Sequence, residues 1–477
     1  MINESFKLLE KSNISWVNYE LLVDRIDSQY YSTKYVQNEI KLLKCGLKID
    51  KLESISEWVK KGIFDMPAKF YLKKREEGIP FIRISNIKLL EFDTTDLVYI
   101  PKEIHKKEIK TELNKGDIVI SKIGSIGNIG IINEELSPCN FSQNNIGIKM
   151  NGKIDSHYLA TYMISKYCLF QLHRYSTIQV QSKLNLSDIR NLIVPIPSPE
   201  IQKYIGDKVR KAEELRKEAK RLKKEVLDRL NTLLFNPNIK IDNNKFLYLD
   251  CKEIIDYKIG ATIYRPKYVS NRRGLKQGIK LLKLKDISRK IYDGNHGSVH
   301  PKNILDEGDI PFIRAQDAHD GLVEINKYIS NEEYRLLKHK TINYGDIVYG
   351  IKGSVGKGGI YLYENSDATV NPACVVISPK KLVNSGYLIE VLESDYFNNE
   401  IYRFAESDST RPQISRTEFE ELEVPMVSEE EQKAIGDLVF RRIKAINQSK
   451  QLIQEAKQDV EDLIEGNFDM SKVKANS

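Results

Sequence analysis

The sequence has few of the residues that hold disulfide-rich domains or metal centres together. Its 477 residues include five cysteines, which are odd in number, widely spaced and free of any Cys-x-x-Cys pair. This pattern argues against a disulfide framework or a zinc site and favours reduced, buried thiols in a cytoplasmic protein. The seven histidines show no metal-ligand spacing. We therefore predict no metal and no cofactor.

Long apolar runs are also missing. Nowhere do about 18 apolar residues follow one another, and residues 1–20 carry charges without a long apolar stretch, so neither a membrane span nor an export signal is expected. A hydrophobic content of 41% and a charged content of 30% are typical of a globular protein, and 477 residues exceed one hydrophobic core. The net charge of +7 permits a polyanionic partner without demanding one.

What the chain does contain is a duplication. The block Gly116-Asp117-Ile118-Val119, followed by Gly-Ser-Ile-Gly at 124–127, returns at 345–348 and 353–356. The offset is constant, since 345 − 116 and 353 − 124 are both 229. Further echoes keep the same order: 31–35 with 264–268, 80–83 with 311–314, and 201–207 with 431–437. A repeat of this length predicts two similar domains.

Each copy predicts an α+β domain with a strand-rich middle. Short runs rich in Ile and Val, separated by Gly, Pro, Asn and Ser, predict strands at 79–84, 117–120, 129–132 and 146–150, and at 310–313, 346–349, 359–362 and 374–377. Apolar residues at helical spacing predict one helix over 157–173 and one over 385–404. Gly124, Gly127, Gly353 and Gly356 are expected where the backbone needs a positive φ or a close approach.

Each copy closes with the signature of a long amphipathic helix. A Pro-punctuated strand end is followed by Ser and acidic residues, and then by apolar residues at steps of three and four among Lys, Arg and Glu. Some 33 helical residues span about 50 Å. One such helix is more often a solvated surface helix, but two of matched length predict an antiparallel coiled coil with pseudo-two-fold symmetry. We expect domains at 1–198 and 237–427, spacer helices at 199–236 and 428–468, and a tail at 469–477.

The order and duplication of these motifs resemble the specificity subunit of Type I restriction-modification enzymes over nearly the whole chain. The turn Pro-x-Pro-Ser-Pro-Glu-x-Gln at 195–202 and the Gly-Asp-Ile-Val blocks carry the resemblance. Asp293-Gly294-Asn295-His296 is similar to an Asp-Gly-x-His turn common in that family, of which Phe64-Asp65-Met66-Pro67 keeps only the acid.

This resemblance implies a non-catalytic subunit with two target recognition domains. Each domain is expected to read half of a split double-stranded DNA target, and the helices are expected to set the gap and dock two methyltransferase (M) subunits. Restriction (R) subunits can join such a complex, which serves phage defence. These roles are implications of the resemblance, and composition alone does not indicate them.

Polar and basic residues in the strand-rich middles are the candidates for DNA contact, because their donors and acceptors match base edges and phosphates. Most polar loop residues are solvated or cap turns, so each candidate is weighed against that role. In the first copy the candidates are Arg83, Ser85, Asn86, Lys122, Ser125, Gln143, Asn144, Gln179, Gln181 and Lys183. In the second copy they are Arg314, Gln316, Asp317, His319, Lys352, Ser354, Lys357, Asn371, Arg411, Gln413 and Arg416.

Two stretches in corresponding places, 179–183 and 409–416, are rich in amide and basic groups and poor in acids. They are typical of loops that face a polyanion. Because the copies differ at these positions, we expect two half-sites of different sequence. On this hypothesis Arg411→Ala changes binding at the second half-site alone, and an even loss over both half-sites in a binding assay would count against it.

Catalytic alternatives find little support in the residues. Asn371-Pro372-Ala373-Cys374 and 236–239 lack the second Pro and the aromatic residue of an amino-methyltransferase, and 256–258 is only a fragment of a metal-nuclease pattern. Gly358 after Lys357 leaves a phosphate-loop pattern incomplete. A helical scaffold whose two modules bind protein or sugar stays open, as does a specificity subunit for a solitary methyltransferase or another defence complex.

Overall fold

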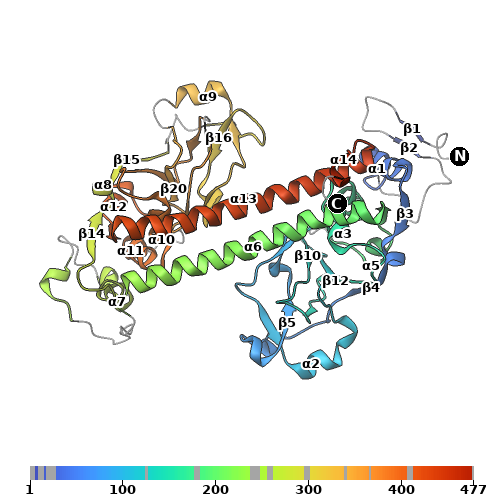
Figure 1. The fold of residues 1–477 in the computed structure, drawn as a ribbon, viewed down its shortest axis with the longest axis horizontal. Coiled ribbons are helices and arrows are strands. Elements are labelled where there is room, and N and C mark those ends of the chain that lie inside the picture. The colour runs from blue at the N-terminus through green and yellow to red at the C-terminus, as the bar shows by residue number, and fades with distance from the viewer. Residues whose placement is uncertain are drawn as a thin grey trace. The chain divides into compact units, whose positions relative to one another are not determined.

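The computed structural model describes residues 6–8, 15–17, 28–123, 127–176, 183–236, 248–254, 261–294, 301–337, 341–364, 367–405 and 412–474. These form two compact units: residues 1–214 with 448–477, and residues 215–447. Two long helices, α6 (Pro199–Leu234) and α13 (Glu429–Glu465), each contribute one part to each unit (Figure 1). Among the described helices, none is long and apolar enough to cross a membrane.

The first unit is built around a four-stranded antiparallel sheet in the order β10-β9-β12-β4. Its strands are β4 (Ser56–Lys61), β9 (Ile118–Ser121), β10 (Ile129–Ile131) and β12 (Asn145–Met150). The same unit contains a three-stranded sheet in the order β11-β5-β8. Its strands are β5 (Ile79–Ile82), β8 (Val98–Ile100) and β11 (Asn140–Phe141). One face of the larger sheet packs on helices and forms the main core, in which Ile118, Ile120, Ile146 and Ile148 are fully buried.

Short strand pairs and helices complete the first unit. The strand pairs are β1 (Phe6–Leu8) with β2 (Ser15–Val17), β3 (Lys48–Lys51) with β13 (Ile193–Ile196), and β6 (Ile87–Lys88) with β7 (Glu91–Phe92). The helices are α1 (Thr33–Lys44), α2 (Lys102–Lys107), α3 (Ser156–Met163), α4 (Lys166–Tyr175), α5 (Leu186–Arg190) and α14 (Ser471–Lys474).

The second unit repeats this plan. Its larger sheet has the order β15-β23-β20-β21-β18-β17, and a three-stranded sheet has the order β19-β16-β22. The strands are β14 (Lys280–Lys283), β15 (Ser288–Asp293), β16 (Ile310–Ile313), β17 (Ala318–His319), β18 (Gly321–Val323), β19 (Tyr328–Ile329), β20 (Ile347–Gly350), β21 (Gly358–Ile360), β22 (Thr369–Val370), β23 (Cys374–Pro379) and β24 (Glu423–Met426). The helices are α7 (Pro266–Arg273), α8 (Leu284–Ile287), α9 (Asn331–Leu336), α10 (Ser385–Glu393), α11 (Asp395–Ala405) and α12 (Arg416–Glu420).

The eight strands predicted from Ile and Val runs are confirmed to within about two residues at their ends. The glycine prediction is confirmed for Gly127, Gly353 and Gly356, which have φ values of 100°, 75° and 90°. Gly124 lies outside the described residues.

The predictions of single helices over 157–173 and 385–404 are wrong, because a serine divides each of them. Ser165 is the N-cap of α4, and its side chain accepts a hydrogen bond from the N–H of Cys168. Ser394 occupies the corresponding place before α11, where its hydroxyl accepts from the N–H of Phe397 at 3.3 Å. A side-chain cap satisfies the free N–H groups of a new first turn, so the chain changes direction between two short helices. The apolar spacing continues across the break and conceals it.

The long helices pack against each other within each unit, and their direction is antiparallel in both. In the first unit, Lys208 of α6 donates to Asp459 of α13 at 2.5 Å, while Tyr204, one turn earlier, contacts Phe468, which follows α13. In the second unit, Glu218 pairs with Arg441 at 3.3 Å and Arg229 pairs with Glu431 at 2.8 Å. The predicted stripe is largely buried, including Val209, Ala212, Leu222, Val226, Ala456 and Val460.

A repeated Gln-x-x-x-Gly sequence explains how each long helix meets its unit. Gln202 accepts from the N–H of Asp155, the N-cap of α3, and Gly206 lies where an added Cβ would stand 2.6 Å from the Asp155 carboxylate. Gln432 and Gly436 repeat the arrangement at Asn384, the N-cap of α10, with a Cβ distance of 2.1 Å. The glutamine holds the two helix starts together, and the glycine permits their close approach.

Candidate nucleic-acid interface

The loops that carry the candidates of the first unit converge at one edge of its sheets. We call Arg83, Lys122, Gln143, Asn144 and Lys183 the first rim. Backbone hydrogen bonds tie its segments together: Ser142 donates to the carbonyl of Ile82, Lys122 to that of Asn144, and Leu184 to that of Lys122, at 3.0 to 3.1 Å. Ile123 and Lys183 form an isolated β-bridge. Residues up to 100 positions apart in the sequence are therefore fixed side by side.

The second unit builds the same edge with the same bonds. We call Arg314, Lys352, Asn371 and Gln413 the second rim. Asn371 donates to the carbonyl of Ile313 at 2.9 Å, Ile351 to that of Ala373 at 2.8 Å, and Ile414 to that of Ile351 at 3.0 Å. Lys352 and Gln413 form the isolated β-bridge. The duplication thus extends to the backbone of the rims, while the side chains on them differ.

Two candidates serve the fold of the rims. Asn86 is fully buried, and its amide donates to Asp93 and Asp96 while its carbonyl accepts from the backbone of Arg83. Asp317 takes the same place in the second unit, where its carboxylate accepts from the backbone and the guanidinium of Arg314 at 2.8 to 2.9 Å. These bonds leave both side chains occupied within their turns, so we regard them as supports for the arginines.

The remaining described candidates differ in how far they are exposed to solvent. Ser85, Asn144, Lys183, Gln316, Gln413 and Arg416 are exposed; Arg83, Gln143, Arg314, Lys352, Ser354 and Asn371 are partly buried. Arg416 forms an ion pair with Glu420 at 3.2 Å, and Arg83 forms one with Asp96 at 2.9 Å. Ser125, Gln179, Gln181 and Arg411 lie outside the described residues. His319 and Lys357 line a cavity that is described below.

The strand register corrects the comparison of the Asp-Gly-x-His turn. Asp293 pairs with Val375 in the second sheet, and Lys61 pairs with Ile146, which lies 229 positions before Val375. Gly62 and Gly294 then correspond, and both have a neighbouring backbone carbonyl within about 2.3 Å of where a Cβ would stand. The first copy therefore keeps the glycine and replaces the acid with Lys61, whereas the sequence comparison had matched the acid at Asp65.

Lys61 is also a rim residue that the sequence analysis missed. Its partner Ile146 pairs on the other side with Ile120, two residues before Lys122. Lys122 is 7% exposed, while Lys61 and Lys183 are exposed at its sides. Burial lowers the pKa of the Lys122 ammonium, and the nearby charges of Lys61 and Lys183 lower it further. Lys61 lies about 60 residues before Lys122 in the chain, and only the pairing of β4 and β9 with β12 brings the two lysines near each other. The sequence does not give this register.

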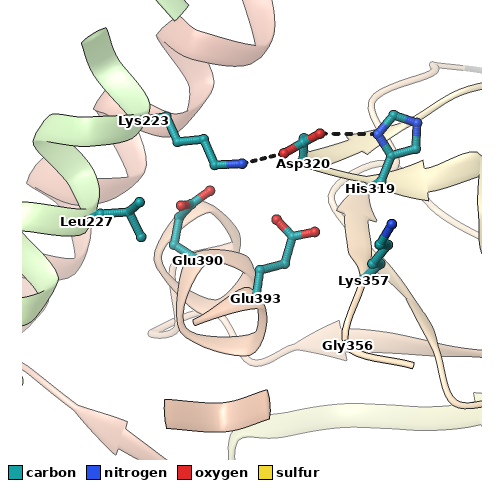
Figure 2. Close-up of a pocket in the computed structure, with 8 residues that line it drawn as sticks. All are labelled: Lys223, Leu227, His319, Asp320, Gly356, Lys357, Glu390 and Glu393. Atoms are coloured by element: carbon teal, nitrogen blue, oxygen red, sulfur yellow. Dashed lines mark hydrogen bonds and ion pairs between the residues drawn. The ribbon is translucent and has the colours of Figure 1, made fainter. Parts of the chain in front are cut away.

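A cavity of about 420 Å³ lies in the second unit between α6, the turn from β17 to β18, the start of β21, and α10. Figure 2 shows Glu390 and Glu393 on α10 facing the ion pair of Lys223 with Asp320, which also contacts His319. Contacts with His319 and Lys223 hold the pKa of Asp320 well below its usual range. Burial, aided by Glu390, raises the pKa of Glu393 to about 7.

The buried ion pair behind this cavity is missing at the two corresponding described positions of the first unit. Arg442 is 1% exposed and forms an ion pair with Glu390, which is 3% exposed, and Arg442 also donates to the carbonyl of Asp320 at 3.1 Å. Gly206 corresponds to Gly436, so Ala212 of the first unit occupies the position of Arg442. The N-cap Asp155 corresponds to Asn384, so Thr161 occupies the position of Glu390. The same fold is thus stable with a buried ion pair or without one.

The titratable groups do not assemble into a metal centre among the residues that the structure describes. Cys139, Cys168 and Cys374 are buried, and burial raises the pKa of each thiol well above its usual range. These thiols are unsuited to nucleophilic chemistry. The geometry of the rims is that of a binding surface: amides, hydroxyls and cations on a rigid backbone.

Comparison with known proteins gives matches to both copies. Residues 48–228 and 276–458 match the family model "Type I restriction modification DNA specificity domain". The Type I restriction enzyme EcoBI specificity subunit of Escherichia coli is 33% identical over 162 residues, 33% of this chain and 33% of that protein. The StySPI specificity subunit of Salmonella potsdam is 30% identical over 143 residues, 28% and 29% of the two chains. The matched segment spans about a third of the length of these relatives.

Solved structures of low sequence identity also match most of the chain. The S subunit of a Type I restriction-modification system from M. genitalium shares 15% identity over 89% of this chain and 96% of its own, with a TM-score of 0.46. The HsdS subunit from Thermoanaerobacter tengcongensis shares 14% identity over the same shares, with a TM-score of 0.29. Because the family model covers both repeats, the chain belongs to the family of the Type I restriction modification DNA specificity domain and carries two copies of that domain.

Proposed function

We propose that this chain is the DNA sequence-specificity subunit of a Type I restriction-modification system. The observation that carries the proposal is the duplicated rim: one backbone arrangement, occurring twice, that presents different side chains each time. A sequence reader needs such an arrangement, because a fixed backbone places the side chains while their identity selects the bases. The first rim then reads one half of a bipartite target and the second rim reads the other half.

The proposed subunit is non-catalytic and acts in the cytoplasm through partners. We propose that recognition domains at 1–198 and 237–427 bind double-stranded DNA, and that helical regions at 199–236 and 428–468 dock two methyltransferase subunits. Restriction subunits join the same complex to cleave unmodified DNA. The 36 residues of α6 correspond to about 54 Å of helix, a length that suits the gap between two half-sites.

The test is sequencing of methylated bases in the DNA of a host with and without the chain, its methyltransferase subunit being present in both. A bipartite motif that appears only with the chain is the expected result. Methylation that is independent of the chain would contradict the proposal. A purified complex with the methyltransferase should also bind duplex DNA less tightly as salt rises, since phosphate contacts release counterions. Binding that ignores salt would favour a scaffold for protein or sugar.

A further inference from the structure

The three lysines Lys61, Lys122 and Lys183 of the first rim form a group for which the described residues supply no anionic partner. Within the described part of the chain, none of the three ammonium groups forms an ion pair or hydrogen bond with another side chain. Lys122 is 93% buried, since its exposed fraction is 7%. Holding a partly buried cation near two others costs free energy in the free protein, and a bound negative charge would lower that cost.

Backbone geometry holds the group in place. Lys61 ends β4 opposite Ile146, and Ile146 faces Ile120 on β9. Lys122 follows β9 by one residue, and Lys183 is fastened to the next position, Ile123, by a β-bridge. Three separate segments thus place their lysines near one another at the edge of the sheet, where the N–H of Lys122 also donates to the carbonyl of Asn144.

The second unit shows that the fold does not require these lysines. Asp293 occupies the position of Lys61 by strand register, and Ile351 occupies that of Lys122 by its hydrogen bond to Ala373. Gln413 replaces Lys183 in the equivalent β-bridge. An acid, an apolar residue and an amide therefore support the same backbone. The cationic group is a property of the first rim alone.

We propose that Lys61, Lys122 and Lys183 bind one phosphate group of the DNA backbone at the first half-site. The proposal rests on the proposed function and adds an asymmetry to it: the first unit carries a phosphate anchor that the second lacks at the corresponding position. Three neighbouring lysines suit a phosphate because each ammonium group is a point charge with several donors. A phosphate contact positions the duplex without reading its sequence.

The experiment uses the complete chain in complex with its methyltransferase subunit, bound to a duplex that contains the target motif and to a duplex that lacks it. Lys122→Met keeps the buried stem and removes the charge. We expect binding to weaken about tenfold on both duplexes, and the negative slope of log K against log salt to become less steep by about 0.9, the value for one phosphate. Lys107→Gln, an exposed position on α2, is the control and should leave the slope unchanged.

Several outcomes would overturn the proposal. The first is an unchanged slope of log K against log salt in Lys122→Met. The second is a loss of affinity that depends on one base pair of the motif. The third is that free inorganic phosphate raises the melting temperature of the wild type while Lys122→Met leaves DNA binding unaffected. Lys61→Gln and Lys183→Gln, at exposed positions, repeat the test if Lys122→Met fails to fold. A wild-type complex without sequence preference would instead count against the proposed function.

The free protein offers a second readout. Without DNA, Lys122→Met should melt at the same temperature as the wild type or higher, because it removes the repulsion of Lys122 by Lys61 and Lys183. A lysine that merely supported the fold would show the opposite, with a lower melting temperature. Weaker DNA binding combined with undiminished stability is the expected signature of the phosphate anchor.

Discussion

The buried ion pair of Arg442 with Glu390 permits a test of how the second unit holds its long helices. Both side chains are almost completely buried, and two nitrogens of the guanidinium, Nε and Nη1, lack hydrogen-bond partners among the described residues. Removing one partner of such a pair leaves an uncompensated buried charge and costs about 3–5 kcal/mol. Glu390→Thr should therefore reduce the free energy of unfolding by about that amount.

Removing both charges should cost much less than the sum of the single changes. The first unit uses Ala212 and Thr161 at these positions, so a neutral pair is compatible with the fold. In Glu390→Thr with Arg442→Met, we expect a loss of about 1–2 kcal/mol, because only the hydrogen bond to Asp320 and part of the packing disappear. Since Arg442→Met alone leaves Glu390 unpaired and should also cost about 3–5 kcal/mol, the double variant should lose at least about 4 kcal/mol less than the two single variants together, and this difference is the coupling energy of the cycle.

Amide hydrogen exchange of α10 in the full-length chain measures these free energies within the second unit. Exchange in α3 of the first unit is the internal control and should not change. If the double variant loses as much as the two single variants together, the pair does not interact as described, and the reasoning from the repeat would be refuted.

Three further predictions follow from the geometry. Glu393 has a pKa of about 7, above its usual value near 4.5, so the folded state binds this proton more tightly and the free energy of unfolding falls as pH rises from about 4.5 to 7. In Glu393→Gln this decrease in the free energy of unfolding between about pH 4.5 and 7 should be smaller by about 2 kcal/mol, after allowance for exposure to the cavity. An unaltered pH dependence of urea unfolding would contradict this. Gly436→Ala places a Cβ 2.1 Å from Asn384 and should lower stability by about 1–3 kcal/mol in thermal unfolding, whereas the exposed control Lys217→Ala should not; equal melting temperatures would show that the helices adjust freely. Insertion of seven residues in both long helices, after 214 and after 447, preserves the apolar stripe and adds about 10 Å to each helix. The gap in the methylated motif should then grow by about three base pairs. An unchanged gap would show that helix length does not set the target spacing.

The fold could be predicted from the sequence wherever a local pattern sets the structure. Runs rich in Ile and Val between turn residues located the strands, and the apolar spacing of α6 and α13 located both long helices and their buried faces. The breaks at Ser165 and Ser394 escaped, because apolar spacing runs through them and a serine inside a helical pattern has two readings: a helix residue or a new N-cap.

The candidate site could be predicted only in part, because loops acquire meaning from their neighbours in space. Lys122, Lys183, Lys352 and Gln413 were named from local composition, but Lys61 was missed, since its place depends on a register with β12. Asn86 shows the opposite limit. Its polar side chain suggested exposure, yet it is buried within a turn, and nothing in its immediate sequence separates the two cases.

The central claim is that each rim reads its own half-site, and one measurement tests it most directly. Methylated bases are sequenced genome-wide in a host that carries the methyltransferase with the wild-type chain, with Gln143→Ala, or with Gln413→Ala. We predict that Gln143→Ala alters the first half of the motif alone and that Gln413→Ala alters the second half alone. Changes that fall evenly on both halves, from either variant, would contradict the account.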